Sequence, residues 1–177
     1  MNIKEIKELI LKRASCRNFS DHPVEREKIE MIVEAARFAP SACNSQPWSV
    51  HVVTENEKRK KIAQAVQTFG INKFADKAPA FMIIVQEKSQ LLPKLADLIK
   101  KVDYTAIDIG IFTAHLVLTA TAAGLSTCII GWFKTKKIRK IINTKNKIRL
   151  VIALGYGNQR ISSKKRKEIN EILKFYD

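Results

Sequence analysis

The chain has 177 residues, 46% of them hydrophobic, which is enough for one compact domain with its own core. The formal net charge is +15, and residues 134–177 hold +11 of it, with 14 basic residues against 3 acidic ones. Such a field attracts anions, whether nucleic acid, an acidic membrane or a phosphorylated small molecule, and charge alone does not choose between them.

The first half of the chain predicts two helices, then a strand, a helix and a strand. Apolar residues at helical spacing predict helices over 2–13 and 25–38, the second ended by Pro40. Enrichment in β-branched residues predicts a strand over 48–54, after which Thr54 is expected to cap a helix that runs to about residue 68. Pro79 then opens a buried strand, AFMIIV.

The second half continues the alternation of helices and strands. A weak helix is expected over 90–100 and a long central helix from Asp103 or Thr105 to Gly124. Buried strands are predicted over 127–133 and 148–156, with a helix over 135–142 between them and a basic helix from about 164. Long helices dominate, so the pattern predicts an α+β sandwich around one sheet, as a single domain over 1–177.

Several classes of protein are disfavoured. Cys16, Cys43 and Cys128 form no Cys-x-x-Cys pair, which argues against a zinc or iron–sulfur site and favours reduced thiols in a cytoplasmic protein. The N-terminal stretch carries charges throughout, unlike a signal peptide. The apolar run 106–124 approaches the length of a membrane span, but Asp108 and His115 interrupt it, so a buried central helix is expected instead.

Two basic segments could hold a phosphate. In RASCR, residues 13–17, an extended chain would present Arg13, Ser15 and Arg17 on one side, and paired guanidinium groups suit a phosphate. In SSKKRK, residues 162–167, Lys164 and Arg166 could join such a site. Taken alone, each segment is better explained as a basic turn or helix start in solvent.

The stretch APSACNSQPW, residues 39–48, is unusually rich in hydrogen-bonding groups for a connection. Prolines fix the backbone on either side, so the side chains between them point in set directions, which suits recognition of a flat heteroaromatic ring. A polar turn that caps Trp48 is the structural alternative. In IIGWF, residues 129–133, Gly131 would let another molecule approach the backbone closely, or would mark a simple bulge.

Taken in order, these segments resemble the flavin-dependent nitroreductase family over nearly the whole chain. The resemblance rests on RASCRNFSDHPVEREKIEMIVEAARFAPSACNSQPWSVHVV, on NKFADKAPAFMIIV, on DIGIFTAHLVLTATAAGLSTCIIGWF, and on RLVIALGYG with KKRK. It implies a mostly antiparallel central sheet flanked by helices, a long buried central helix, and a homodimer that binds FMN at the subunit interface. It also implies an FMN-dependent oxidoreductase that passes hydride from NAD(P)H through flavin N5 to an oxidised acceptor such as a nitroaromatic or quinone.

The resemblance assigns cofactor-binding roles to twelve residues and names no catalytic side chain. Phosphate binding falls to Arg13 and Ser15 with the terminal pair Lys164 and Arg166, and the pyrimidine edge of the flavin to Arg17 and Asn72. Backbone N–H groups near N5 come from Ile130 and Gly131. The ring in the partner subunit's site would be lined by Pro40, Ser41, Ala42 and Asn44.

Two other functions remain as alternatives. One is a flavin-binding protein of the same fold that sequesters or transforms FMN or acts as a dehydrogenase. The other is a basic nucleic-acid-binding module, which leaves the residue 39–48 loop unexplained and lacks aromatic residues interleaved with the basic ones. The expected partners are therefore a second copy of the chain and a small-molecule electron acceptor, with neither nucleic acid nor a membrane.

Overall fold

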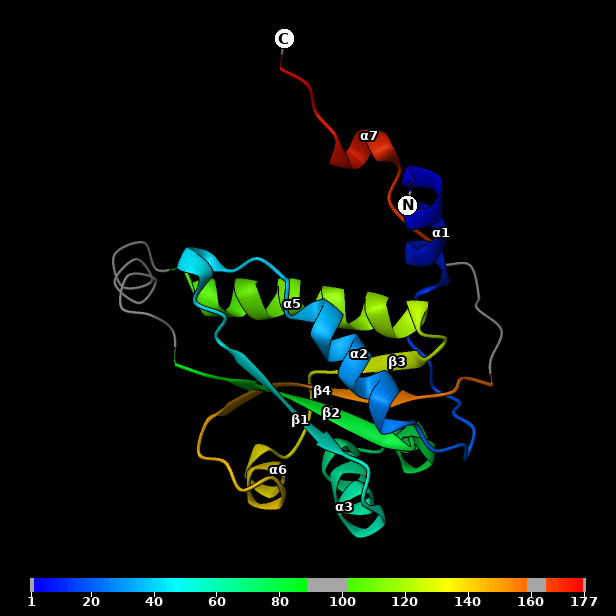
Figure 1. Cartoon of the computed structure of the whole chain (residues 1–177), viewed down its shortest axis with the longest axis vertical. Helices are drawn as coiled ribbons and strands as arrows, with labels where there is room; N and C mark the ends of the chain where they lie inside the picture. The colour runs from blue at the N-terminus through cyan, green and yellow to red at the C-terminus, as the bar shows by residue number, and fades with distance from the viewer. Residues whose placement is uncertain (1, 89–101, 159–164, 177) are drawn as a thin grey trace.

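The computed structural model describes residues 2–88, 102–158 and 165–176. Four antiparallel strands form one sheet in the order β1 (Trp48–Val53), β2 (Ala80–Gln86), β4 (Lys147–Gly155) and β3 (Ser126–Ile130) (Figure 1). The α+β architecture and the antiparallel sheet expected from the sequence are confirmed. The weak helix expected over 90–100 lies outside the described residues.

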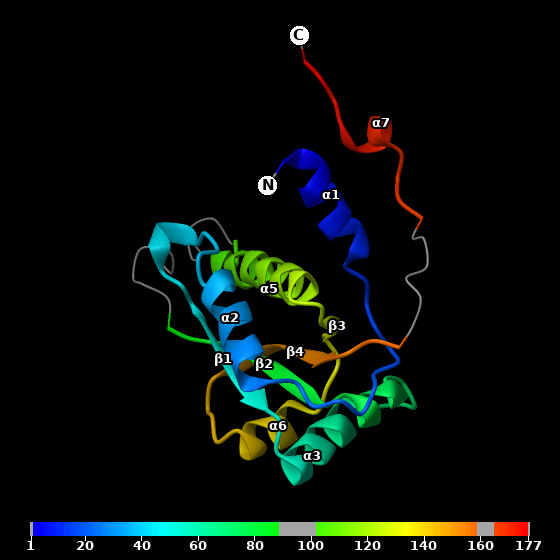
Figure 2. The ribbon, with the colours of Figure 1, turned by 45° about the vertical axis from the view of Figure 1, so that its right-hand side comes forward.

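Helices cover both faces of the sheet (Figures 1 and 2). On one face lie α2 (Arg26–Ala36) and α5 (Tyr104–Ala122), and on the other α3 (Asn56–Val66) and α6 (Thr135–Ile141). Strand β2 is central and buried on both sides: Phe81 and Ile83 point into the α3/α6 core, and Met82 and Ile84 into the α2/α5 core. This explains why AFMIIV is a continuous apolar run rather than an alternating one.

Helix α5 buries one side and exposes another. Its buried side chains include Ile109, Phe112 and Leu116, which pack in the α2/α5 core. The outward side is also apolar, with Ile107 half exposed and Gly110 and Ala114 exposed. By length and composition α5 could cross a membrane, but its packing against the sheet makes it the core helix that the sequence predicts.

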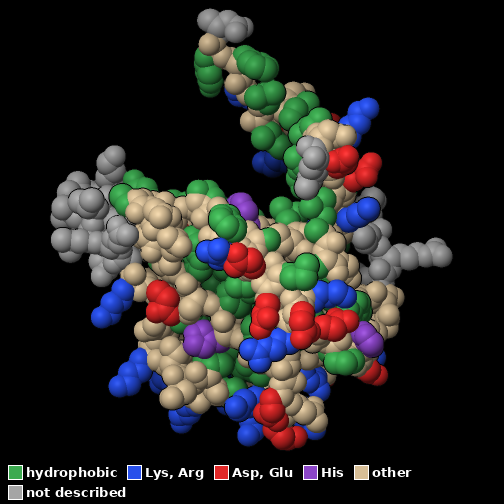
Figure 3. All heavy atoms as spheres, viewed as in Figure 1, with side chains coloured by type: hydrophobic (Ala, Val, Ile, Leu, Met, Phe, Trp, Pro, Cys, Tyr) green, Lys and Arg blue, Asp and Glu red, His purple; other side chains and the backbone are tan. Residues whose placement is uncertain are grey.

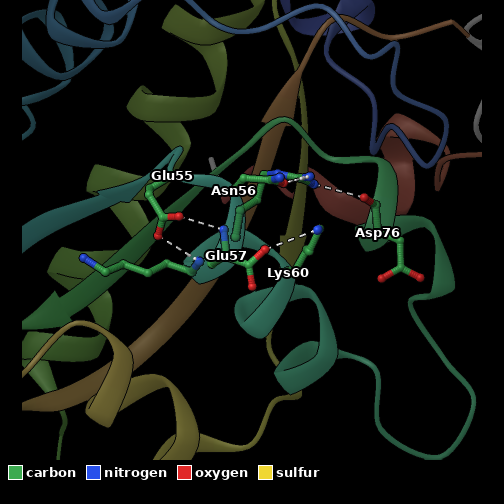
Figure 4. A network of polar contacts seen from close by, with 7 residues as sticks. Glu55, Asn56, Glu57, Lys60 and Asp76 are labelled. Atoms are coloured by element: carbon green, nitrogen blue, oxygen red, sulfur yellow. Dashed lines mark hydrogen bonds and ion pairs between the residues drawn. The ribbon is translucent and has the colours of Figure 1, made fainter.

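The start of α3 differs by one residue from the prediction. Glu55, not Thr54, caps the helix, and its carboxylate accepts the N–H groups of Glu57 and Lys58 at 2.8 and 3.0 Å (Figure 4). A carboxylate reaches two N–H groups at once and carries the charge that a helix N-terminus favours, so it outcompetes the hydroxyl. Arg59 then donates to the carbonyl of Asp76, which ties α3 to the short helix η2 (Lys73–Lys77).

The two ends of the chain extend away from the body. Helix α1 (Ile3–Lys12) has no buried residue, and α7 (Ile169–Ile172) has none either (Figures 1 and 2). The predicted basic helix from 164 is wrong for residues 165–168, which are not helical. Consecutive like charges there disfavour a helix, and Glu168 starts one only where its capping box with Glu171 forms.

Asp103 anchors the start of α5. Its carboxylate accepts the N–H of Ala106 at 2.8 Å and pairs with Arg149 at 2.8 Å. Burial by itself raises the pKa of Asp103, but the hydrogen bonds from Arg149 and from the Ala106 N–H together hold that pKa below its ordinary value. A carboxyl group whose pKa is lowered by folding stabilises the fold above its unfolded pKa and loses this contribution as the pH falls.

Asp103→Ala should therefore lower the free energy of unfolding by about 1 kcal/mol near neutral pH, because a helix cap and an ion pair are lost. The difference from the wild type should shrink as the pH falls below about 4, the ordinary pKa of an aspartate, and through the lowered pKa of the folded state. Urea denaturation of both proteins across a pH series measures this. A difference that stays constant into the acid range would contradict the assignment.

Candidate functional site

The RASCR segment lies beside β3. Ser15 forms a parallel bridge with Thr127, and the N–H of Cys16 donates to the Thr127 carbonyl at 2.8 Å. Farther on, Phe19 bridges to Gly157, where a Cβ would come within 2.5 Å of the Ser126 hydroxyl oxygen. The beginning of the chain is thus held along the strand that leads to Ile130 and Gly131.

A cleft of about 520 Å³ opens between α1, α5 and the sheet. Apart from Arg13 and Thr113, its lining consists of apolar residues and glycine: Ile10, Gly110, Ala114, Val117, Leu118, Ile129 and Leu150. Arg13 is half-buried, and the buried hydroxyl of Thr113 has no hydrogen-bond partner among the described residues. A planar apolar group that carries a negative charge would match this size and lining.

The loop after α2 meets the first turns of α5. Asp108, which is only 4% exposed, accepts the N–H of Ala42 at 3.0 Å. Ser41 accepts the N–H of Gln46 at 3.0 Å, so the polar groups brace the loop itself. Figures 1 and 2 place this loop at the opposite end of α5 from α1, so within one chain it does not meet the cleft of Arg13.

A third segment, residues 66–72, approaches the end of β3. The side-chain amide of Asn72 donates to the Val66 carbonyl at 3.1 Å, and the N–H of Lys134 donates to the Ala65 carbonyl at 2.8 Å. These bonds bring the Asn72 loop beside the chain that follows Gly131. The rings of Phe69 and Trp132 lie 6.2 Å apart, and both side chains are largely exposed, at 89% and 60%.

Comparison with known proteins identifies the family. A model of the "Nitroreductase family" matches residues 10–71, and one described as "Putative TM nitroreductase" matches residues 64–177. A protein of Archaeoglobus fulgidus named "Putative NADH dehydrogenase/NAD(P)H nitroreductase" is 31% identical over 160 residues, which cover 87% of this chain and 86% of that protein. The chain belongs to the nitroreductase family.

Two further proteins to which the chain is similar have names that mention FMN. The "FMN reductase [NAD(P)H]" of Bacillus subtilis is 29% identical over 139 residues, covering 73% of this chain and 55% of that protein. A structure from Exiguobacterium sibiricum, described as a "putative nitroreductase in complex with FMN", superposes with a TM-score of 0.80 at 20% identity. It covers 96% of each chain, which establishes the shared fold.

The structure places the predicted nitroreductase residues in two groups. Arg13 and Ser15 lie at the cleft or beside β3, with exposed Arg17 shortly after them, and Ile130 and Gly131 end that strand. Ile130 is buried, so only its backbone could meet a ligand. The second group is the loop of Pro40, Ser41, Ala42 and Asn44 at the far end of α5.

Two of the predicted positions, Asn72 and Arg166, do not line the cleft. Asn72 lies in the segment beside Gly131 but does not line the cleft. Arg166 lies on the C-terminal segment, donates to the carbonyl of Lys165 and is absent from the cleft lining. Lys164 lies outside the described residues.

Sequence reasoning missed three residues that the structure places at or beside these segments. In the sequence, Asp108 is noticeable only because its charge interrupts an apolar run. A single acidic residue on a core helix nevertheless indicates a buried hydrogen bond, because a buried carboxyl group needs a partner. Phe69 and Trp132 are 63 positions apart, and only the fold pairs them. The φ of +53° at Phe69 is strained for an aromatic residue, which sequence does not reveal.

Proposed function

We propose that this chain is an FMN-dependent oxidoreductase that takes hydride from NAD(P)H and reduces a small oxidised acceptor such as a nitroaromatic or quinone. Family membership and the relatives named for NAD(P)H nitroreductase and FMN reductase activity support it. The observation that carries the proposal is the Arg13 cleft, whose apolar walls and single guanidinium suit a flat ring with a phosphate. We take residues 1–177 as one domain working in the cytoplasm.

The chain's own residues would hold the cofactor from several sides. Arg13 and Ser15 would bind the phosphate through charge-assisted and hydroxyl hydrogen bonds, aided by Lys164 and Arg166 from the C-terminal segment. The hydroxyl of Thr113, which has no hydrogen-bond partner among the described residues, is a further polar group in the cleft lining.

The ring would be recognised along its polar edge and over its face. Arg17 and Asn72 would face the pyrimidine edge; the bond from the Asn72 amide to Val66 leaves its carbonyl oxygen to accept an N–H. The backbone N–H groups of Ile130 and Gly131 would lie near N5. When bound, FMN would accept a hydride at N5 and pass it to an acceptor. The reaction therefore requires no side-chain acid or base.

A homodimer would complete the site. The two predicted groups of residues lie at opposite ends of α5, and the outward side of α5 between them is apolar. Figure 3 shows further apolar side chains exposed on α1 and α7. A second copy packed against α5 about a two-fold axis would cover this surface, and we propose that it brings Pro40, Ser41, Ala42 and Asn44 over its partner's cleft.

Ala114→Arg tests the dimer. Ala114 is exposed on the outward side of α5, so a charge there would be buried without a partner in the proposed interface. We expect light scattering after size-exclusion chromatography to find a folded monomer. Ala114 also lines the cleft of Arg13, so the oligomeric state alone is the readout of this test. Gln64→Arg, exposed on α3 across the sheet, is the matched control and should stay dimeric. A dimeric Ala114→Arg variant would place the interface elsewhere.

Arg13→Ala combined with Arg17→Ala tests the phosphate and ring-edge assignments. Two guanidinium groups would be lost, each donating charge-assisted hydrogen bonds, so FMN affinity should fall by about a hundredfold or more while the protein stays folded and dimeric. Arg26→Ala with Arg37→Ala removes the same charge from exposed positions on α2 and should leave FMN binding unchanged. Full flavin content after purification of the first double variant would show the assignment to be wrong.

The function itself is tested by anaerobic visible spectra of the FMN-loaded protein before and after addition of NADH and of NADPH. Bleaching of the bound-flavin band, followed by rapid recovery when a nitroaromatic or quinone is added, is the expected result. A bound flavin that neither nucleotide reduces would favour the sequestering alternative. A protein that binds no FMN would refute the proposal.

A further inference from the structure

The loop between α2 and β1 holds a backbone conformation that its residues do not prefer. Cys43, Asn44 and Gln46 have φ values of 51°, 52° and 45°, in the left-handed region that costs a residue with a side chain about 1 kcal/mol or more. Such strain persists only where surrounding contacts over-determine it. The loop therefore needs anchors, and the structure shows where they are.

Both ends of the loop are anchored on one face of α5. At its beginning, the N–H of Ala42 donates to Asp108 at 3.0 Å. At its end, the indole of Trp48 stacks on Phe112, with ring centroids 4.7 Å apart and planes 14° from parallel. Asp108 and Phe112 are one helical turn apart, so a single rigid surface fixes both ends.

Among the described residues, the Pro47 carbonyl accepts the N–H of Glu87 at 3.0 Å, and other hydrogen bonds of the loop are internal. Gln46 donates from its backbone to Ser41 and from its side chain to the backbone and side-chain oxygens of Asn44. These bonds shape the loop but do not orient it against the helix. Asp108 is the polar contact with α5 that determines where the Ser41–Asn44 backbone lies.

Burying a carboxyl group in this part of the core costs free energy, because the group loses its contact with water. Asp108 is 4% exposed, beside Ile109 and Phe112. The cost of removing it from water is offset by the hydrogen bond from Ala42, and an apolar side chain of similar size would leave that N–H without its acceptor. The presence of an acid here thus points to orientation of the loop.

We propose that Asp108 is a positioning residue for the cofactor site: through its hydrogen bond to Ala42 it holds the Ser41–Asn44 backbone in the conformation that receives the flavin ring. The inference rests on the proposed function, in which this loop lines the ring in the partner subunit's site. It predicts that flavin affinity depends on the hydrogen bond at Ala42 and does not simply follow the overall stability of the protein.

Asp108→Leu should raise the dissociation constant for FMN about tenfold, because the Ala42 N–H loses its acceptor and the loop loses this attachment to α5. The melting temperature of the FMN-free protein is measured in the same series. Asp108→Asn keeps an acceptor oxygen and should restore affinity to within about threefold of the wild type. Hydrogen exchange at the Ala42 amide of the FMN-free proteins should be fast in the Leu variant and slow in the Asn variant.

Asp103→Ala is the matched control. It removes an acid five residues earlier, at the N-cap of the same helix, whose carboxylate bonds Ala106 and Arg149, and should lower the melting temperature while leaving FMN affinity unchanged. Wild-type FMN affinity in the Leu variant, or affinity lost in all three variants in proportion to melting temperature, would overturn the inference. If the Leu variant fails to fold, Asp108→Ala replaces it in the same comparison. A wild-type protein that binds no FMN would instead refute the proposed function.

Discussion

Helix α5 is apolar around its circumference, yet the described parts of a single chain cover only one side of it. The covered side packs on the sheet with α2 and creates half of the core. The outward side, including Ile107, Gly110 and Ala114, stays exposed together with the apolar residues of α1 and α7. The cleft beside Arg13 opens on this same outward side. For this reason we propose that one partner, a second copy of the chain, both covers α5 and completes the site.

The large positive charge is mostly separate from this surface. Residues 134–158 hold eight basic residues and no acidic one, and they include α6 and the turn into β4. Helix α6 lies with α3 on the face of the sheet opposite α5, and Figure 3 shows Lys and Arg side chains gathered there. If the cleft binds an anion as proposed, the charge nearest to it is therefore the local guanidinium of Arg13.

Sequence reasoning succeeded where a pattern maps directly onto burial. The run AFMIIV is buried on both faces, and its continuous apolar composition predicts a central strand. The apolar run from 106 to 124 is too long for a strand and therefore predicts a helix. The resemblance to a family supplied the candidate residues, since no spacing rule links Arg13 to Gly131. The missed features depend on three-dimensional contacts: the Phe69–Trp132 pair, the bond from Ala42 to Asp108 and the left-handed backbone at Cys43. Element ends also shifted where a capping acid competed with a hydroxyl, as at Glu55.

The two tryptophans of the chain stand in different surroundings. Trp48 stacks on Phe112 at the end of the anchored loop, whereas Trp132 is 60% exposed next to Gly131. Indole fluorescence depends on solvent contact and on neighbouring rings, so the protein carries two intrinsic optical probes with distinct emission. Trp48 reports on the seating of the loop against α5, and Trp132 reports on what enters the space beside the end of β3. With either one replaced by phenylalanine, the other gives a single-site signal, either from the loop against α5 or from the end of β3.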